Sequence, residues 1–351
     1  MIRISVPASR KYDVMVASGL VDRAGAYLQE VCQKGCTVAV ISDSNVWPLY
    51  GDRTQNSLVQ AGFRVIHYVF PAGEASKNAT TYLEILNFLA EHHLTRSDAL
   101  LALGGGVVGD ITGFAAATYL RGIPYMQVPT SLLAMVDSSV GGKTAIDLPA
   151  GKNLVGAFYQ PSMVLCDPSV LSTLPNYVFT DGCAEIIKYG MLYDAQLFDR
   201  LLAEGLEFDR ESVIGRCISL KRDVVCMDEF DTGLRQKLNL GHTIGHGVEA
   251  QSNFQITHGQ AVAIGMAIVT KAAAGRKLCT ADVYTHLLRV LEKFRLPTTT
   301  DYSAKQLSAS ALSDKKRSGS SVNLIIPRAI GDCEIIRTPV AELESFIQEG
   351  L

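Results

Sequence analysis

Two of the chain's seven histidines lie four residues apart in the stretch LNLGHTIGHGVEA. On a helix this spacing places His242 and His246 on the same face. Glu185 and Lys188 share one face of the helical segment GCAEIIKYG, and His258 follows in ITHGQAVAIG just before another helical pattern. One carboxylate and two imidazoles can bind a divalent cation and leave a position open for substrate oxygens. The residue types and their spacing therefore predict a catalytic metal site.

The spacing of the paired histidines is that of the HExxH motif of zinc peptidases. HTIGH lacks the glutamate that would act as the general base, so a peptidase of that class is disfavoured. We expect no chemical role for the four other histidines, which are His67, His92, His93 and His286.

A glycine-rich turn follows the apolar run ALLALG, residues 99–104, and precedes a helical pattern. The glycines at 104, 106 and 109 spell GxGxxG, in which the backbone can approach a pyrophosphate at a helix N-terminus. The turn does not follow the first strand, and the acidic residue expected about 20 positions later is missing. A tight turn without a ligand is the alternative. Asp43 as a partner for a ribose hydroxyl and Lys77 for a phosphate favour dinucleotide binding, with an unusual geometry.

The segment VDSSVGGKTAIDLPAGKN, residues 136–153, is rich in Gly, Ser, Asp and Lys. Lys143 and Lys152 lie among its glycines, where a lysine is commonly a solvated loop residue. Two such lysines beside a predicted nucleotide site favour contacts with an anion instead.

The order of the patterns indicates two domains. Up to about residue 175, continuous apolar strands at 37–42, 63–70, 99–104, 125–130 and 163–168 alternate with helical patterns after an opening hairpin. From about residue 178 nearly every segment has helical periodicity, and only the terminal SVNLIIPRAIGDCEIIRT predicts another hairpin. We therefore expect an α/β fold, with a doubly wound, mainly parallel sheet in residues 1–175 and a mainly α-helical domain in residues 176–351.

Composition narrows the class of protein. Hydrophobic residues make up 48% of the 351 residues and charged residues 19%, which is typical of a well-buried globular chain. Lys and Arg number 32 against 35 Asp and Glu, a net charge of −3 without a basic block, so nucleic acid is not an expected partner. The N-terminal segment has no signal-peptide core, and the apolar stretches are too short to span a bilayer. We expect a cytoplasmic protein with a small-molecule substrate.

Five stretches together carry a resemblance to a known family: GGGVVGD, RGIPYMQVPTSLLAMVDSSVGGKTA, GKNLVGAFYQP, AEIIKYG and LRQKLNLGHTIGHGVEA. They resemble 3-dehydroquinate synthase, of the sugar-phosphate cyclases, and the similarity runs from near Ile2 to the terminal LIIPRAIGDCEI. The family converts 3-deoxy-D-arabino-heptulosonate 7-phosphate to 3-dehydroquinate and phosphate, in the shikimate pathway of aromatic amino acid biosynthesis. It uses NAD and a divalent metal ion, zinc or a similar ion such as cobalt. The resemblance implies NAD binding by residues 1–175 and metal and substrate binding by residues 176–351.

By this resemblance, Glu185, His242 and His258 are the metal ligands, whereas His246 is placed beside the substrate phosphate and is implicated in proton transfer. The two paired histidines thus have different tasks. Positions matching those that grip the substrate carboxylate and hydroxyls are Lys143, Lys188, Lys221, Asp137, Asn153 and Asn239. The phosphate end is matched by Arg235, Asn239, His246 and one lysine of DKK, Lys315 or Lys316.

The resemblance also assigns the cofactor and the assembly. The matching NAD positions are Asp43, Asn45, Glu74, Lys77, Gly106, Val107, Val108, Gly109, Asp110, Thr130, Ser131, Lys143, Lys152 and Thr173. Arg121 matches an arginine that in the family reaches the neighbouring subunit's site, which implies a homodimer.

The chain departs from the family at a few positions. DEFD stands where DExE is usual, so Asp231 replaces a longer carboxylate that has been assigned a proton-handling role. One methylene less could make that contact water-mediated, which would affect rate more than reaction type. Asp147 and Leu148 stand in place of Asn-His, Ala72 in place of an aspartate, and Ser131 in place of a second threonine.

Three alternatives have distinct signatures. A metal-dependent alcohol or glycerol dehydrogenase of the same fold would release NADH, and would not need Lys143, Lys188, Lys221 and Arg235 around an anionic substrate. A sibling cyclase that makes a secondary-metabolite cyclitol would disrupt VDSSVGGKTA. A catalytically silent sensor of NAD or sugar phosphate would lose a metal ligand. The chain keeps the four cationic residues, the VDSSVGGKTA segment and all three matched metal ligands, which favours the synthase.

Overall fold

The computed structural model describes residues 1–253, 255–313 and 320–351. These residues form two compact units, one of Met1–Pro175 with Arg210–Phe230 and one of Asn176–Asp209 with Asp231–Leu351. A single boundary at 175, as expected from the sequence, does not account for the return of Arg210–Phe230 to the first unit.

The returning segment carries the helix α7 (Arg210–Met227), which packs against the N-terminal strand of the first unit. Its residues Val213, Ile214 and Cys217 are fully buried. Gly215 lies so close to Ile2 that an added Cβ would come within 2.8 Å of that side chain. Helical periodicity alone could not show which unit this apolar face covers, because the pattern specifies a buried face and not its partner.

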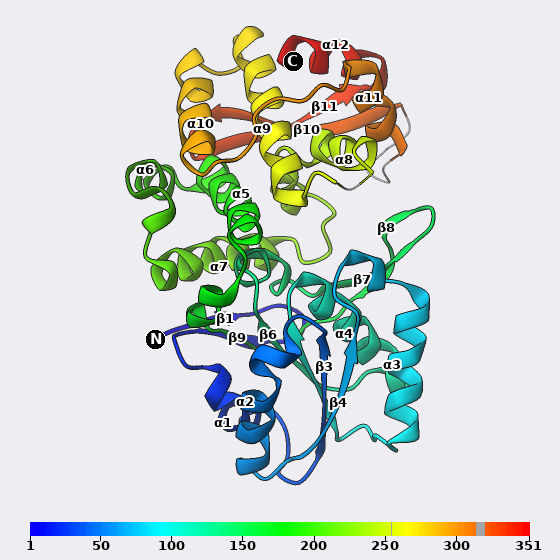
Figure 1. Ribbon diagram of the computed structural model, residues 1–351. Helices are drawn as coiled ribbons and strands as arrows, with labels where there is room; N and C mark the ends of the chain where they lie inside the picture. Colours follow the sequence, from blue (N-terminus) through cyan, green and yellow to red (C-terminus); the bar gives the residue numbers. More distant parts are fainter. Residues whose placement is uncertain (254, 314–319) are drawn as a thin grey trace. The chain divides into compact units, whose positions relative to one another are not determined.

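A seven-stranded sheet forms the centre of the first unit (Figure 1). Only its first two strands pair antiparallel, and all other neighbours are parallel. In spatial order the strands are β1 (Ile2–Val6), β2 (Tyr12–Val16), β9 (Met163–Cys166), β6 (Tyr125–Pro129), β5 (Ala99–Gly104), β3 (Thr37–Asp43) and β4 (Arg64–Phe70). The predicted opening hairpin and the predicted mainly parallel sheet are confirmed.

The chain order reverses next to β3. Strand β4 pairs with one edge of β3, whereas β5 pairs with the other. The loops that follow β3 and β5 therefore leave the carboxyl ends of these strands in opposite directions. Such a switch point is where open α/β sheets bind their ligands.

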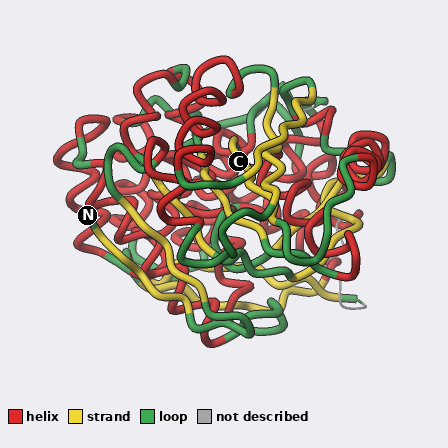
Figure 2. Tube along the Cα trace, turned by 90° about the horizontal axis from the view of Figure 1, so that it is seen from below, coloured by secondary structure: helices red, strands yellow, loops and turns green. Residues whose placement is uncertain are grey.

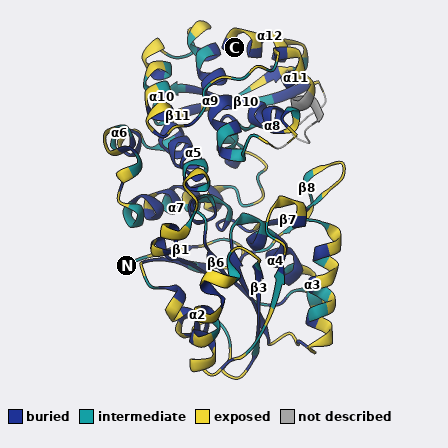
Figure 3. Ribbon diagram, viewed as in Figure 1, coloured by how far each residue is buried: buried dark blue, intermediate teal, exposed yellow. Residues whose placement is uncertain are grey.

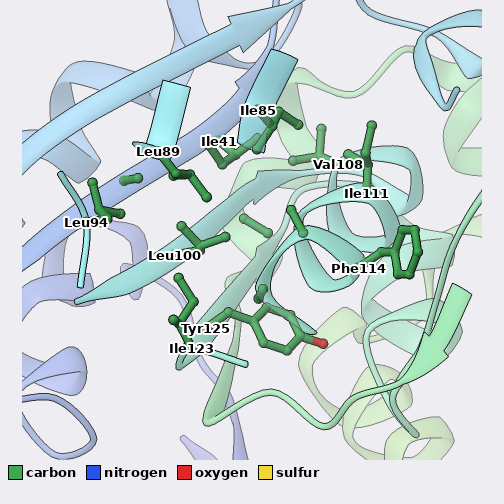
Figure 4. Packing of buried hydrophobic residues seen from close by; sticks show 14 of the residues in the cluster. Ile41, Ile85, Leu89, Leu94, Leu100, Val108, Ile111, Phe114, Ile123 and Tyr125 are labelled. Carbon is green, nitrogen blue, oxygen red and sulfur yellow. The ribbon is translucent and has the colours of Figure 1, made fainter. Parts of the chain in front are cut away.

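Helices pack on this sheet, and Figure 2 shows the course of the chain with helices in red and strands in yellow. The helices and shorter helical turns of the first unit are Val21–Arg23, α1 (Ala24–Leu28), α2 (Trp47–Gln60), Glu74–Ser76, α3 (Ala79–Glu91), α4 (Gly106–Thr118), Tyr119–Arg121, a π-helical turn at Ala134–Ser138, Pro168–Thr173 and α7. Leu89 of α3 and Ile111 of α4 pack on Ile41 and Leu100 of the sheet (Figure 4). Alternate strand residues such as Val38 and Val40 are equally buried, so the sheet is enclosed on both faces.

The polar segment 136–153 is not simply a loop. It contributes β7 (Lys143–Leu148) and part of β8 (Gly151–Phe158), which form an antiparallel hairpin in the first unit. Gly156 is required by this pairing, since a Cβ there would lie 2.0 Å from the Thr144 carbonyl oxygen. The many glycines, which weaken a strand prediction, here permit close backbone approach.

The second unit is mainly helical, as predicted. Its elements are α5 (Asn176–Tyr193), α6 (Ala195–Glu204), Gly205–Glu207, Leu234–Asn239, α8 (His242–Gln251), α9 (His258–Gly275), α10 (Ala281–Lys293), α11 (Ala304–Ser313), the hairpin of β10 (Ser321–Ala329) and β11 (Asp332–Pro339), and α12 (Val340–Gly350). Helix α9 is buried along most of its length, dark blue in Figure 3, because α5, α8, α10 and α12 pack around it. Within the described residues, no helix combines the length and apolarity needed to cross a membrane.

Leu89 tests the packing of α3. Replacing it with alanine (Leu89→Ala) should lower the free energy of unfolding of the first unit by about 2–5 kcal/mol, because a fully buried side chain leaves a cavity. Leu83, on the same helix but 54% exposed, is the matched control, and Leu83→Ala should cost less than about 0.5 kcal/mol. Denaturant titration followed by circular dichroism measures both. Equal losses would contradict the packing assigned to Leu89.

Candidate active site

Three helices of the second unit bring one carboxylate and two imidazoles together. Glu185 lies on α5, His242 is the first residue of α8, and His258 is the first residue of α9. Their potential ligand atoms all lie within 4.8 Å of one another. The Glu185 Oε1 atom is 3.5 Å from His242 Nε2 and 3.4 Å from His258 Nε2. The three residues matched to metal ligands by the sequence resemblance are therefore neighbours.

Glycines allow α8 and α9 to approach closely enough for this. An added Cβ at Gly241 would lie 2.6 Å from the Val262 carbonyl oxygen, and one at Gly265 would lie 2.0 Å from the Gly241 carbonyl oxygen. Gly241 also has φ = +77°, a conformation that other residues rarely adopt. The glycines of the GHTIGHG stretch thus serve the helix crossing that places two histidines side by side.

A second close contact fixes the start of α9 against α5. Asp181, one turn before Glu185, accepts hydrogen bonds from the Thr257 hydroxyl and, at 3.0 Å, from the Gln260 backbone N–H. These groups lie at the N-terminus of α9, where backbone donors need acceptors and negative charge is favoured. Gly259 fits against the Asp181 backbone, from whose oxygen an added Cβ would be 1.9 Å away. Asp181 therefore fixes the position of His258, which lies between Thr257 and Gly259 at the start of α9.

Each ligand imidazole is oriented through its other nitrogen. His242 Nδ1 is 3.0 Å from the Leu240 carbonyl oxygen, and His258 Nδ1 is 3.3 Å from Glu249 Oε2. A carbonyl or carboxylate at Nδ1 favours the tautomer with the proton there, which leaves the Nε2 lone pair available to a metal ion. The donor set of one carboxylate and two such imidazoles fits a catalytic zinc or cobalt ion.

The charges around His258 also favour a cation. Burial lowers the pKa of this imidazole, but hydrogen bonds and charge interactions with Glu185 and Glu249 outweigh burial and raise it to about 10. The site therefore stabilises positive charge at this position, which is the electrostatic environment that a divalent ion requires.

Other residues that the sequence matched to substrate contacts lie in the same unit. Lys188 is 1% exposed and forms an ion pair with Glu185. Arg235 is 2% exposed and lies on the short helix Leu234–Asn239, which ends two residues before α8 begins. The His246 ring centroid is 5.6 Å from that of His242 and 6.2 Å from that of His258. Asp231 has φ = +59°, and Lys315 and Lys316 lie outside the described residues.

The residues matched to NAD contacts lie in the first unit, and all of them except Lys143 and Lys152 lie at or after the carboxyl ends of its parallel strands. Asp43 is the last residue of β3 and Asn45 follows it, Glu74 and Lys77 follow β4, the first residues of α4 (Gly106, Val107, Val108, Gly109 and Asp110) follow β5, Thr130 and Ser131 follow β6, and Thr173 follows β9. Neighbouring parallel strands end at one edge of a sheet, so these segments share the edge that contains the switch point.

The glycine loop has two parts with different physical roles. An added Cβ at Gly104 would lie 2.4 Å from Val108, and one at Gly109 would lie 2.7 Å from Gln127, so these two glycines serve packing of α4 on the sheet. Gly105 and Gly106 instead face the hydroxyls of Ser131 and Ser138. Helix α4 begins at Gly106 without a side-chain cap at Gly105, which leaves its first N–H groups suited to an anion.

Lys77 connects the glycine-loop helix to the β7–β8 hairpin. Its Nζ atom lies 2.6 Å from Asp110 Oδ2 and 2.6 Å from Asn153 Oδ1, and its side chain is almost fully buried. Burial lowers the pKa of Lys77, but Asp110 and Glu74 outweigh burial and raise it, so the ammonium stays charged. Asn153 has φ = +54° and donates its N–H to Asp147 Oδ1 at 2.7 Å. Asp147, a departure from the family pattern, thus stabilises the conformation of Asn153.

Asp137 and Lys221 form a second ionic contact in the first unit. Lys221 Nζ, on α7, lies 2.9 Å from Asp137 Oδ1 and 2.6 Å from the Asp137 carbonyl oxygen. Asp137 belongs to the π-helical turn, a distortion that is frequent at functional sites. The return of α7 to this unit is what places Lys221 there.

Four further residues matched by the sequence resemblance remain to be placed: Lys143, Lys152, Arg121 and Asn239. Lys143 is the first residue of β7 and is exposed, and Lys152 on β8 lies 3.8 Å from Glu74. Arg121 is exposed, with φ = +68°. Asn239 donates its side-chain amide to the Gln236 carbonyl at 3.0 Å.

Sequence reasoning missed two carboxylates, Asp181 and Glu249. Asp181, Glu185 and Lys188 follow the spacing i, i+4 and i+7 on α5, and His242, His246 and Glu249 follow the same spacing on α8. Residues with this spacing lie on one helix face. Asp181 therefore extends the row of polar side chains on α5 by one turn, and Glu249 extends the row on α8 by one turn. The spacing could have identified both residues.

Gly259 tests the contact between α9 and α5. Gly259→Ala should weaken zinc binding by at least about tenfold, because the Cβ must displace the N-terminus of α9 and with it His258. Gly275, at the other end of α9 with no atom within 4 Å of an added Cβ, gives the matched control Gly275→Ala. Zinc affinity measured by chelator competition should be unchanged in the control. Equal affinity in both variants would contradict this account of the site.

Two family models together match residues 67–317, and solved structures match this chain over nearly its whole length. A model described as 3-dehydroquinate synthase N-terminal matches residues 67–181, and one described as 3-dehydroquinate synthase C-terminal matches residues 182–317. Among solved structures, ValA, a 2-epi-5-epi-valiolone synthase from Streptomyces hygroscopicus subsp. jinggangensis 5008 with NAD+ and Zn2+ bound, is 28% identical, with a TM-score of 0.88 over 99% of this chain and 98% of that one. The fold of a 2-deoxy-scyllo-inosose synthase complexed with carbaglucose-6-phosphate, NAD+ and Co2+ is also similar, with a TM-score of 0.89 at 24% identity over the whole of both chains.

A curated relative gives the more direct comparison. The 3-dehydroquinate synthase of Streptococcus suis (strain 05ZYH33) is 42% identical over 344 residues, which cover 96% of this chain and 97% of that protein. Identity at this level over nearly full length, together with both family models, is consistent with the metal-ligand geometry of the second unit and the switch-point loops of the first. The chain belongs to the 3-dehydroquinate synthase family.

Proposed function

We propose that this protein converts 3-deoxy-D-arabino-heptulosonate 7-phosphate to 3-dehydroquinate and phosphate, a carbon–oxygen lyase reaction of the shikimate pathway. The observation that carries the proposal is the cluster of Glu185, His242 and His258, with buried Lys188 beside it. A metal site next to a buried cation suits a substrate that carries both hydroxyl oxygens and negative charge.

NAD and a zinc or cobalt ion are the proposed cofactors, because the two similar cyclase structures contain NAD+ with Co2+ or Zn2+. When bound, NAD supplies reversible hydride acceptance, and the ion supplies Lewis acidity toward a substrate oxygen. Because the hydride is returned within one cycle, the overall reaction is redox-neutral. The chain's own residues have to bind the substrate, orient it and handle protons.

The second unit supplies cations for the anionic substrate. Lys188 and Arg235 are both almost fully buried, where a charged side chain binds a carboxylate or phosphate more strongly than it would in water. We assign Lys188 and Asn239 to the carboxylate and hydroxyls, and Arg235 to the phosphate. Lys315 is assigned to the phosphate end by the family match alone.

The first unit supplies the complementary polar groups. Lys221 is held by Asp137. Asn153 is held by Lys77 and Asp147. Both Lys221 and Asn153 are therefore fixed before any substrate contact. Such preorganisation limits the side-chain entropy lost on binding. We assign Lys143, Lys221, Asp137 and Asn153 to substrate binding, and the loops after the parallel strands to NAD.

His246 is the proposed proton carrier. It lies on the same face of α8 as His242 and has its ring near both ligand imidazoles without belonging to the Glu185 group. Removal of a proton next to a ketone and loss of the neighbouring phosphate convert the substrate to an enone, and a histidine beside the phosphate can relay that proton. Asp231 is assigned a supporting proton-handling role.

Two further parts of the proposal concern assembly and location. We infer a homodimer from the family match of Arg121, which is exposed and, like Leu120, has a positive φ. A cytoplasmic location is proposed from membership of this family of biosynthetic enzymes.

Phosphate release distinguishes the proposal from its alternatives. Metal-loaded protein with sub-stoichiometric NAD should release many equivalents of phosphate from 3-deoxy-D-arabino-heptulosonate 7-phosphate without lasting absorbance from NADH. Accumulation of NADH in proportion to product would establish a dehydrogenase instead. Absence of phosphate release with NAD bound would favour a sibling cyclase or a silent sensor.

His246 can be separated from the metal ligands. His246→Gln should lower kcat by about 10²- to 10⁴-fold, the range typical of a general acid–base residue, with zinc content unchanged. His286→Gln on α10 is the control and should retain full activity. Turnover is measured by phosphate release and metal content by elemental analysis. Loss of zinc from His246→Gln would show that this residue is a ligand rather than a proton carrier.

A further inference from the structure

Glu249 is a buried carboxylate next to the metal-ligand group but outside it. It lies on α8, 3% exposed, and its Oε2 atom is 3.3 Å from His258 Nδ1. The other nitrogen of the same ring, Nε2, lies 3.4 Å from Glu185 Oε1. His258 is therefore held between two carboxylates, one at each nitrogen.

The two nitrogens of a neutral imidazole cannot both bind a metal ion, because only one of them carries a free lone pair. His246, Glu249 and His258 form a second group whose potential ligand atoms lie within 4.8 Å of one another. Glu249 faces His258 Nδ1, so an ion bound at this nitrogen would leave the proton on Nε2, which faces Glu185. The two groups thus compete for His258.

The contacts of His242 favour the Glu185 group over the group of His246, Glu249 and His258. Its Nδ1 is occupied by the Leu240 carbonyl, and its Nε2 faces Glu185 at 3.5 Å. The Glu185 group therefore already has one imidazole in the tautomer required for metal binding, and His258 completes it when its own proton lies on Nδ1. A carboxylate at Nδ1 stabilises that tautomer and increases the basicity of Nε2.

We propose that Glu249 is a positioning residue that holds His258 by its Nδ1–H and so sets the affinity of the Glu185 site for its metal ion. Glu249 does not bind the ion. This inference deepens the proposed function, on whose metal site it rests. It adds Glu249 to the α8 residues matched from the family, and it assigns distinct roles to His242, His246 and Glu249.

The test compares zinc affinity among Glu249→Ala, Glu249→Gln and the parent protein. Outer carboxylates of this kind typically contribute 10- to 100-fold in metal affinity, so we expect Glu249→Ala to bind zinc about 100-fold more weakly. Glu249→Gln keeps an oxygen that can accept from Nδ1–H but removes the charge, and should lose about tenfold. Affinities come from chelator competition, and the visible spectrum of the cobalt-loaded protein should show altered coordination in Glu249→Ala.

Asp167→Asn is the control for loss of a buried carboxylate. Asp167 is fully buried in the first unit, where it accepts backbone N–H groups of Gly19 and Val21. This variant should bind zinc as the parent does. Thermal unfolding of each metal-free variant separates metal affinity from fold stability, and Glu249→Gln keeps the test valid if Glu249→Ala does not fold.

Several outcomes would overturn the inference. Zinc affinity within twofold of the parent in both Glu249 variants, with an unchanged cobalt spectrum, would show that Glu249 does not position His258. A bound-metal stoichiometry that falls from two in the parent to one in the variants would make Glu249 a ligand of a second ion. Zinc binding is measured without substrate, so a protein that binds zinc but releases no phosphate would refute the proposed function and leave this inference standing.

Discussion

The close crossing of α8 and α9 is the constraint on which the metal site depends. Glycines at 241 and 265 let the two helix backbones approach to a distance that any side chain would prevent. Because His242 and His258 are the first residues of these helices, the crossing places both imidazoles at one point. The contact of Gly259 with α5 then sets their distance from Glu185. A ligand set assembled from three helix positions is rigid, since each side chain moves only if a packed helix moves.

Charged side chains of the second unit contact two of the three proposed metal ligands. Lys188 contacts Glu185, and Glu249 contacts His258, so each of these two ligands has a partner of opposite charge or complementary hydrogen-bonding character. Buried charges cost free energy unless they are paired and hydrogen-bonded. Their retention here is therefore better explained by metal and anion binding than by fold stability. The first unit uses the same principle at Lys77, whose ammonium is buried between Asp110 and Asn153.

Much of the fold could be predicted from local patterns, and what escaped prediction depends on pairing between distant segments. The continuous apolar run at 99–104 is β5 with those bounds, because a strand buried on both faces needs no alternation. The destination of α7 and the β7–β8 hairpin could not be predicted, since an apolar stripe does not name its partner and glycines weaken a strand pattern. For the site, spacing suggested one carboxylate and two imidazoles, but only the family resemblance selected His242 over His246. Asp181 and Glu249 were within reach of the same spacing rule.

The glycine loop, which we propose to bind NAD, illustrates why position along the chain is a poor guide to a nucleotide site. Its place after β5 rather than after the first strand weakened the motif, yet β5 is adjacent to β3 at the point where strand order reverses. What matters physically is that the loops after β3 and β5 diverge, and that α4 begins at an uncapped glycine beside this gap. Strand order is a property of hydrogen-bonded pairing, which the sequence does not record. In this proposal Asp43 takes the place of the missing acidic residue, because the end of β3 reaches the same edge of the sheet from earlier in the chain.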